Sequence, residues 1–411
     1  MGIDLASLPE RIDHIQVSTT SGKSGRLTHG AHYSFGYESP AEQVALAMPV
    51  QSAVFNRGSL HPIFEMNLPE GFVRRQLSER LQRYTRISDM LFLAIQGDEG
   101  IGRLKYESDI IRTVPVHDKL SEIISWDGKQ NLFSELLDRH IFNTTLSGMQ
   151  PKLAIRSDKA SLLSPDLIIK TGGEDYPQLA LNEYVCMSIA KAAGLSTPKF
   201  CLSDNQQLFI MDRFDIQNGQ FLGMEDFAVL MGRSGHERYL GSYENAAKVI
   251  NLYTGSHKDM ASFFDYVVLS CLLGNGDAHL KNFALLYHHP SQPAFLSPIY
   301  DVVCTQVYEL EEKTLALKMN KSRDFPTRER ILRFANALGI KSAETRLEQM
   351  ADIALQQLHT IDELSDFPEL KRMLKKTISH TVALDSAQIG YTGLRKDSKK
   401  RKTDAILSRK N

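Results

Sequence analysis

The segment Gly274-Asn275-Gly276-Asp277-Ala278-His279-Leu280-Lys281-Asn282 decides how the rest of the chain is interpreted. It follows an apolar helical stretch, precedes a strand-like run and places Asp277 five residues before Asn282. By itself this spacing is also compatible with turn residues around a buried His279, because Asp and Asn favour loops for local reasons. The other parts of the chain must decide between a turn and a catalytic loop.

The catalytic interpretation rests on the chemistry of phosphoryl transfer. Kinase catalytic loops use the same spacing, because the two side chains must converge on one phosphoryl group. Asp277 would accept the proton of the incoming hydroxyl, and Asn282 would hold Mg²⁺ through its oxygen. Nineteen residues further on, we expect Tyr300-Asp301 to lie on a short strand, where Asp301 would be the second magnesium ligand.

Other features expected of a kinase precede this loop in the expected order. A turn of small residues at 144–152 ends in Lys152, and such a turn can lay backbone N–H groups over phosphates. Lys170 ends an apolar strand, and Glu183 lies on the next helix, an arrangement that orients a lysine toward the phosphates of ATP. Taken singly, the turn at 144–152 could be an ordinary hairpin turn, and Lys170 and Glu183 could be a surface ion pair.

Composition excludes several classes of protein. The chain has 411 residues, of which 42% are hydrophobic, so it can build a sizeable core over two or three domains. Its net charge of −1 excludes a chain that is basic throughout. The four cysteines form no CxxC pair, which argues against a disulfide framework or a zinc cluster. We expect a cytoplasmic protein, because the sequence contains neither a secretory signal nor an apolar run long enough to cross a membrane.

Hydrophobic periodicity predicts an α+β protein with a two-lobed, protein-kinase-like fold and a small N-terminal α/β subdomain. The predicted strands are residues 100–106, 152–156, 166–170, 200–202, 207–211 and 283–287, with another near Ile299. The predicted helices are 70–81, 87–95 and 179–193, and the whole of 326–388 is predicted to be helical. The predicted divisions are an N-terminal subdomain at 1–110, a connector at 111–135, a kinase N-lobe at 136–215, a helical C-lobe at 216–390 and a basic tail at 391–411.

Several segments together resemble the HipA family, the serine/threonine kinase toxins of bacterial type II toxin–antitoxin systems. They are Leu146 to Lys152, Ile168 to Lys170, Asn182 to Tyr184, Asp212 to Asp215, Gly274 to Phe283 and Pro298 to Asp301. Two segments of the N-terminal zone resemble the family's N-terminal subdomain, namely Tyr33 to Tyr37 and Asn67-Leu68-Pro69-Glu70-Gly71. The resemblance covers residues 25–385.

The resemblance implies a role for each matching residue. Asp277 would be the catalytic base, with Asn282 and Asp301 holding Mg²⁺. The residues implied in ATP binding are Ser147, Gly148, Met149, Gln150, Pro151 and Lys152 over the phosphates, Lys170 holding them, Asp212, Arg213 and Phe214 at the adenine, and His279, Leu280, Lys281 and Tyr300 lining the nucleotide site.

The resemblance also implies regulation and partners. Family members autophosphorylate a serine of the glycine-rich loop; here Thr145 and Ser147 are the two candidate acceptors. A phosphate there would add negative charge to a site built for anions and oppose ATP binding. The implied protein substrate is an aminoacyl-tRNA synthetase. The implied partner is a small helix-turn-helix antitoxin, through which DNA would be contacted only indirectly.

Alternatives remain open for the function and for two segments. The chain could be a small-molecule phosphotransferase on the same fold, or a catalytically silent regulatory homologue. The polar loop from Gly232 to Tyr239 either faces a protein substrate or is a plain surface loop. The basic run from Arg395 to Lys402 is a solvated tail, contacts DNA phosphates within an antitoxin complex, or helps to dock a tRNA-bound target.

Overall fold

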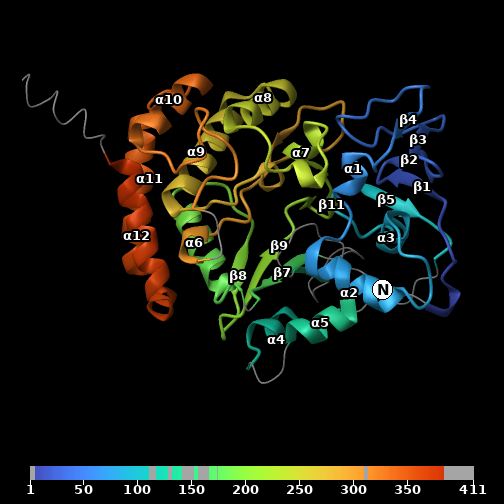
Figure 1. The fold of residues 1–411 in the computed structure, drawn as a ribbon, viewed down its shortest axis with the longest axis horizontal. Coiled ribbons are helices and arrows are strands. Elements are labelled where there is room, and N and C mark those ends of the chain that lie inside the picture. Colours follow the sequence, from blue (N-terminus) through green and yellow to red (C-terminus); the bar gives the residue numbers. More distant parts are fainter. Residues whose placement is uncertain are drawn as a thin grey trace, which may run out of the picture.

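The computed structural model describes residues 5–110, 117–127, 132–140, 152–155, 166–173, 175–309 and 313–383. The elements follow one another from the blue N-terminal sheet at one end of the molecule to the orange and red helices at the other (Figure 1). The green strands of the central sheet lie between them (Figure 1). The predicted mixed α+β class is confirmed.

The N-terminal part is built on a five-stranded antiparallel sheet in the order β4-β3-β2-β1-β5. Its strands are β1 (His14–Thr19), β2 (Gly22–His29), β3 (Tyr33–Tyr37), β4 (Phe55–Arg57) and β5 (Leu104–Glu107), and its helices are α1 (Pro62–Glu65), α2 (Gly71–Leu81) and α3 (Asp89–Gln96). Helix α3 is apolar almost throughout, because it is buried between the sheet and its neighbours. The predicted helix over residues 70–81 is confirmed, and the predicted strand at 100–106 begins only at Leu104.

A second antiparallel sheet, in the order β6-β7-β9-β8, forms the centre of the molecule. It consists of β6 (Lys152–Ile155), β7 (Leu167–Thr171), β9 (Leu208–Asp212) and β8 (Phe200–Leu202), flanked by α4 (Leu120–Ile124), α5 (Leu132–His140) and α6 (Leu179–Ala192). Side chains of β9 alternate between two cores. Phe209 and Met211 pack with α6 and the C-terminal helices, whereas Leu208 and Ile210 pack with the N-terminal part. A strand buried on both faces is therefore apolar at successive positions.

The C-terminal part is largely helical. Its helices are α7 (Phe227–Leu230), α8 (Tyr243–Tyr253), α9 (His257–Leu273), α10 (Arg328–Leu338), α11 (Ala343–Thr360) and α12 (Pro368–Val382). It also contains the hairpin β10 (Ile216–Gln217) and β11 (Gln220–Phe221), and a small antiparallel sheet of β12 (Gly223–Asp226), β13 (Ala284–Tyr287) and β14 (Phe295–Leu296). The sequence predicted β13 but missed the hairpin and β12, whose pairing with β13 joins segments about sixty residues apart.

Two predictions on secondary structure were wrong. The strand expected to carry Tyr300 and Asp301 does not exist, because β14 ends at Leu296 and Asp301 has a left-handed backbone with φ of 56°. Strand residues require negative φ, and a non-glycine residue held at positive φ is typical of functional sites. The region 326–383 is not wholly helical, since residues 339–342 and the 3₁₀ turn Asp362–Asp366 separate its three α-helices.

The predicted domain boundaries stay predictions. One hydrophobic cluster contains residues of the first sheet together with Leu153 and Ile169 of the central sheet, so the core crosses the expected boundary near residue 136. No helix among the described residues is long and apolar enough to cross a membrane.

Candidate active site

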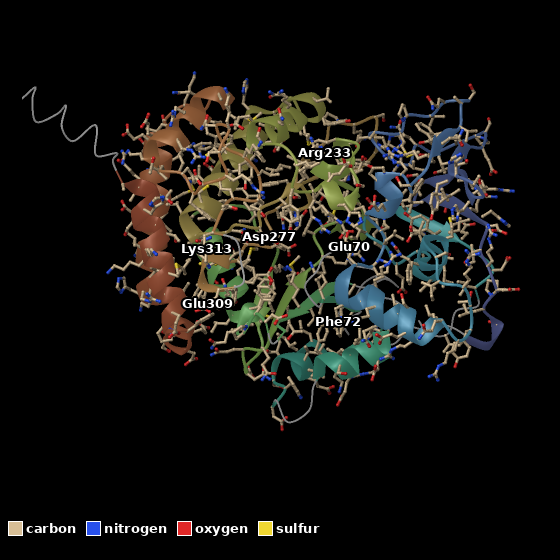
Figure 2. The ribbon with its side chains drawn as sticks, viewed as in Figure 1. Glu70, Phe72, Arg233, Asp277, Glu309 and Lys313 are labelled. Atoms are coloured by element: carbon tan, nitrogen blue, oxygen red, sulfur yellow. The ribbon has the colours of Figure 1, made fainter. Side chains whose placement is uncertain are left out.

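Asp277 lies where the longest buried helix of the C-terminal part, α9, gives way to a tight loop. Gly274 ends α9 in the left-handed conformation, and its N–H bonds back to the carbonyls of Ser270 and Cys271. The buried side chain of Asn275 accepts a hydrogen bond from the backbone N–H of Asp277 at 3.0 Å. This arrangement leaves the Asp277 carboxylate 49% exposed at the surface of the cleft. Figure 2 places it near the centre of the molecule.

The buried side chain of Asn282 forms a hydrogen bond within the same loop. Its Oδ1 accepts a hydrogen bond from the backbone N–H of His279 at 3.1 Å, and its Nδ2 lies 3.4 Å from Oδ2 of Asp301. An amide oxygen has two acceptor positions, so the bond to His279 leaves one for a cation. The turn thus holds the asparagine against the second predicted magnesium ligand.

The position of Asp301 is set by a contact network around its backbone. The hydroxyl of Tyr266 donates to the carbonyl of Tyr300 at 2.6 Å, and the hydroxyl of Tyr300 donates to the carbonyl of Lys281 at 2.8 Å. These contacts tie the segment to α9 and to the loop that carries Asp277 and Asn282. They hold Asp301 in its left-handed conformation with the carboxylate in the cleft.

Lys170 and Glu183 form the ion pair that the sequence predicts. The Lys170 Nζ lies 2.5 Å from Oε1 of Glu183, and both side chains are buried. The same ammonium group also contacts the Asp301 carboxylate, which in turn lies 3.7 Å from Nζ of Lys152. Three predicted site residues, Lys152, Lys170 and Asp301, therefore meet in one cluster.

Asn182 fixes the position of α6 relative to the segment that carries Asp301. Its side chain donates to the carbonyl of Cys304 at 3.0 Å and accepts from the N–H of Cys304 at 2.8 Å. This reciprocal pair is buried and connects residues far apart in the chain. Because Glu183 is the next residue of α6 and Asp301 lies just before Cys304, the pair aligns the two carboxylates on Lys170.

The electrostatics of the cluster follow from burial and charge. Burial lowers the pKa of Lys170, but Asp301 and Glu183 outweigh it, so this pKa is raised and the lysine is charged. Burial raises the pKa of Asp301, but Lys152 and Lys170 outweigh it and hold this pKa well below its usual range. Burial, together with Arg238 and Lys281, lowers the pKa of His279 to about 3. His279 is therefore neutral near pH 7.

The donor set fits a magnesium ion. Mg²⁺ takes oxygen ligands and is usually held by one or two carboxylates together with substrate phosphates. Asp301 offers its carboxylate beside the two lysines, and Asn282 Oδ1 has one further acceptor position, although Nδ2 is the Asn282 atom that lies against Asp301. Among the described residues no group of three or more His, Cys, Asp or Glu side chains is arranged to hold a metal.

Comparison with known proteins assigns the chain to a family. The model of the HipA-like C-terminal domain matches residues 144–359, more than half of the chain, and the model of the HipA N-terminal domain matches residues 15–107. The chain belongs to the HipA family. The kinase-like protein Y4dM of Sinorhizobium fredii is 30% identical over 287 residues, which cover 64% of this chain and 66% of that protein.

Two comparisons relate this HipA-family protein to Shewanella oneidensis. The serine/threonine-protein kinase toxin HipA of that organism is 24% identical over 233 residues, covering 48% of this chain and 49% of the toxin. The structure of its HipA with HipB and operator DNA superposes with a TM-score of 0.66 at 18% identity, covering 89% of this chain and 96% of that one. The alignments with Y4dM and the toxin span less than two thirds of either relative, and the structural likeness shows a shared fold.

The remaining predicted site residues are divided between the cleft and its surroundings. Phe214 stacks on Tyr300 with ring centroids 5.0 Å apart, and both line the cleft. Arg213 also lines it, but its guanidinium bonds to Asp215 at 2.6 Å. Leu280 is buried in the hydrophobic core, and Asp212 ends β9 outside the cleft. Thr145, Ser147, Gly148, Met149, Gln150 and Pro151 lie outside the described residues.

The sequence patterns did not assign Glu70, Arg238 or Tyr239 to the site. Glu70 binds Nζ of Lys281 at 2.6 Å and Nη1 of Arg238 at 3.1 Å, and the hydroxyl of Tyr239 donates to Oδ1 of Asp277 at 2.9 Å. Glu70 belongs to the quoted Asn67–Gly71 segment, and Tyr239 to the polar loop after Gly232, so both segments were noticed. Their partners are distant in sequence, which is why no local pattern revealed the contacts.

Proposed function

We propose that this protein is an ATP- and Mg²⁺-dependent serine/threonine protein kinase. The observation that carries the proposal is the convergence of Lys170, Asp301, Asn282 and Asp277 on one cleft, with the buried Glu183 paired to Lys170. The names of the relatives support a kinase, and the Shewanella toxin supports serine and threonine as acceptors. Membership of the HipA family adds support, because both halves of the chain match the family models.

In this proposal each side chain has one task. Lys170, kept charged by Glu183, and Lys152 bind the phosphates of ATP, while Phe214 and Tyr300 contact the nucleoside. Asn282 and Asp301 hold Mg²⁺, whose chemistry when bound is to neutralise charge on the transferred phosphoryl group. Catalysis then depends mainly on positioning and on charge neutralisation.

The proton of the acceptor is taken by Asp277. Its carboxylate is half-exposed at the edge of the cleft, whereas Asp301 is paired with two lysines. As the acceptor O–H gives its proton to Asp277, the acceptor oxygen forms a bond to the γ-phosphorus and the bond from that phosphorus to ADP breaks. His279 is a poorer candidate for this role because its side chain is buried, whereas that of Asp277 is half-exposed.

The finer parts of the proposal concern regulation, target and partner. We propose autophosphorylation at Thr145 or Ser147, an aminoacyl-tRNA synthetase as protein substrate with growth arrest as the consequence, and binding of a small helix-turn-helix antitoxin. The relative from Shewanella supports the last part, since its structure contains HipB and operator DNA. DNA would then be retained only when the antitoxin is present.

Incubation of the purified protein with Mg-ATP tests the proposal. Intact mass and peptide mapping should show about one phosphate on Thr145 or Ser147, and Asp277→Asn should slow its appearance by about 10²- to 10⁴-fold. The same assay with purified aminoacyl-tRNA synthetases as acceptors tests the target class. Equal phosphorylation by the wild type and Asp277→Asn would contradict the role of Asp277, and transfer to neither self nor synthetase would contradict the kinase.

A further inference from the structure

The Asp277 carboxylate is already engaged by a hydroxyl group of the protein itself. The phenol of Tyr239 donates a hydrogen bond to Oδ1 of Asp277 at 2.9 Å. Its ring stands edge-on to the His279 ring, with centroids 5.0 Å apart and an interplanar angle of 79°. A kinase base must accept a hydrogen bond from the acceptor hydroxyl at this distance, so Tyr239 makes the contact that an acceptor would have to make.

The loop that carries Tyr239 is built to hold it there. Ser234 and Glu237 form a reciprocal capping box, and the guanidinium of Arg233 bonds to the carbonyl of Leu240, which closes the loop on itself. The backbone N–H of Leu280 donates to the carbonyl of Arg238 at 3.2 Å and fastens the loop to the catalytic segment. The phenol is therefore placed by a structured loop.

The N-terminal part holds the same loop from the other side. The N–H of Gly235 donates to Oε1 of Glu65 at 3.0 Å, and Arg238 binds Glu70. Figure 2 shows Glu70 and Arg233 on the side of Asp277 that faces the N-terminal elements. The loop 232–241 thus contacts both the N-terminal part and the segment that carries Asp277.

Two glycines lie at the ends of the loop. Gly232 and Gly241 bound it at φ of 68° and 113°, conformations that glycine adopts without strain and that suit hinge positions. Tyr239 and Leu240 are 42% and 54% exposed, which places two large apolar side chains at the surface beside the base. Such a surface suits an extended polypeptide, which offers apolar side chains next to its hydroxyl.

We propose that the hydroxyl of Tyr239 occupies the position of the acceptor hydroxyl on Asp277. A polypeptide acceptor displaces the loop 232–241 from Asp277 and then binds to the surface of this loop. This inference rests on the proposed function and specifies its acceptor side. The acceptor is a protein segment with a serine or threonine hydroxyl. That hydroxyl replaces the phenol on Asp277 before transfer, while Tyr239 itself stays unmodified.

The variant Tyr239→Phe tests the inference, with Tyr84→Phe as a matched control. Tyr84 is 50% exposed and lies in the N-terminal part. With dephosphorylated casein as acceptor, Tyr239→Phe should lower KM for casein by about 3- to 10-fold, because one competing hydrogen bond is gone. A lowered kcat at unchanged KM would instead show that Tyr239 positions the base, and would overturn the inference.

Hydrogen–deuterium exchange without nucleotide gives a readout that needs no catalysis. Segment 232–241 should exchange faster in Tyr239→Phe than in the wild type or Tyr84→Phe, and equal rates would overturn the inference. A phosphate on Tyr239 after incubation with Mg-ATP would overturn it as well. Failure of the proposed function looks different: casein would stay unphosphorylated by the wild type, and ATP hydrolysis would equal that of Asp277→Asn.

Discussion

The two sides of the cleft differ in how tightly their charged groups are held. On the phosphate side, Lys170 and Glu183 are 2% and 0% exposed and share a cluster with Asp301. On the acceptor side, Asp277 is 49% exposed and contacts an exposed tyrosine. Buried charges depend on each other for their stability, whereas exposed ones can exchange partners at little cost. The phosphate side is therefore fixed before any ligand binds, and the acceptor side stays adjustable.

The largest effect expected from this difference is on stability. Glu183→Ala should lower the free energy of unfolding by about 3 kcal/mol, because it removes a carboxylate from a buried lysine. Asp277→Asn should change it by less than about 0.5 kcal/mol, since the side chain is half-exposed. Urea denaturation followed by circular dichroism measures both variants. Similar losses for the two would remove the distinction between the sides.

A second effect concerns acid stability. The pKa of Asp301 is lowered in the folded protein, so its stabilising contribution is present above the usual pKa of an unfolded aspartate, near 3.8. It is lost as the pH falls through the lowered value. The wild type should therefore exceed Asp301→Asn in unfolding free energy at pH 6 by about 2 kcal/mol, and this advantage should shrink steadily below about pH 4. An advantage that persisted unchanged to pH 2 in urea denaturation would contradict the paired state of Asp301.

The smallest effect is expected at the junction of the two sides. Glu70→Gln weakens the contacts to Lys281 and Arg238, whose side chains are 10% and 13% exposed. We expect a loss of about 1 kcal/mol in unfolding free energy, because hydrogen bonds to charged groups of intermediate burial are affected. Glu79→Gln, an exposed change on the same helix, is the matched control and should stay within about 0.5 kcal/mol. Equal values for both variants would mean that Glu70 does not join the N-terminal part to the catalytic loop.

Local patterns predicted the elements that carry the site well. The loop with Asp277 and Asn282, the strand with Lys170 and the helix with Glu183 were all predicted, because each depends on neighbouring residues, and the strand ends one residue later, at Thr171. The Asp301 segment was assigned correctly to the site and wrongly to a strand. Its apolar neighbours Ile299 and Tyr300 are buried like strand residues, but tertiary hydrogen bonds hold the backbone in another conformation.

Contacts at the acceptor side could not be predicted in the same way. No local rule indicates that Glu70 binds Lys281, and Tyr239 was visible only as part of a polar loop. Arg213 and Leu280 matched the family pattern, yet the fold uses Arg213 in a buried pair with Asp215 and places Leu280 in the core. A residue pattern specifies the type of side chain, whereas its neighbours depend on how distant segments pack.

The sequence alone determined the order of the chemical groups: a lysine on a strand, a glutamate on the next helix, then Asp277, Asn282 and Asp301. Such spacings are local, since backbone geometry relates residues that are close in the chain. Only the tertiary structure decided which of these groups meet. Lys170 contacts Asp301 across 131 positions, and Glu70 contacts Lys281 across 211. Burial of a shared core brings these segments together, and it also decides that Asp301 is paired with lysines while Asp277 is left half-exposed.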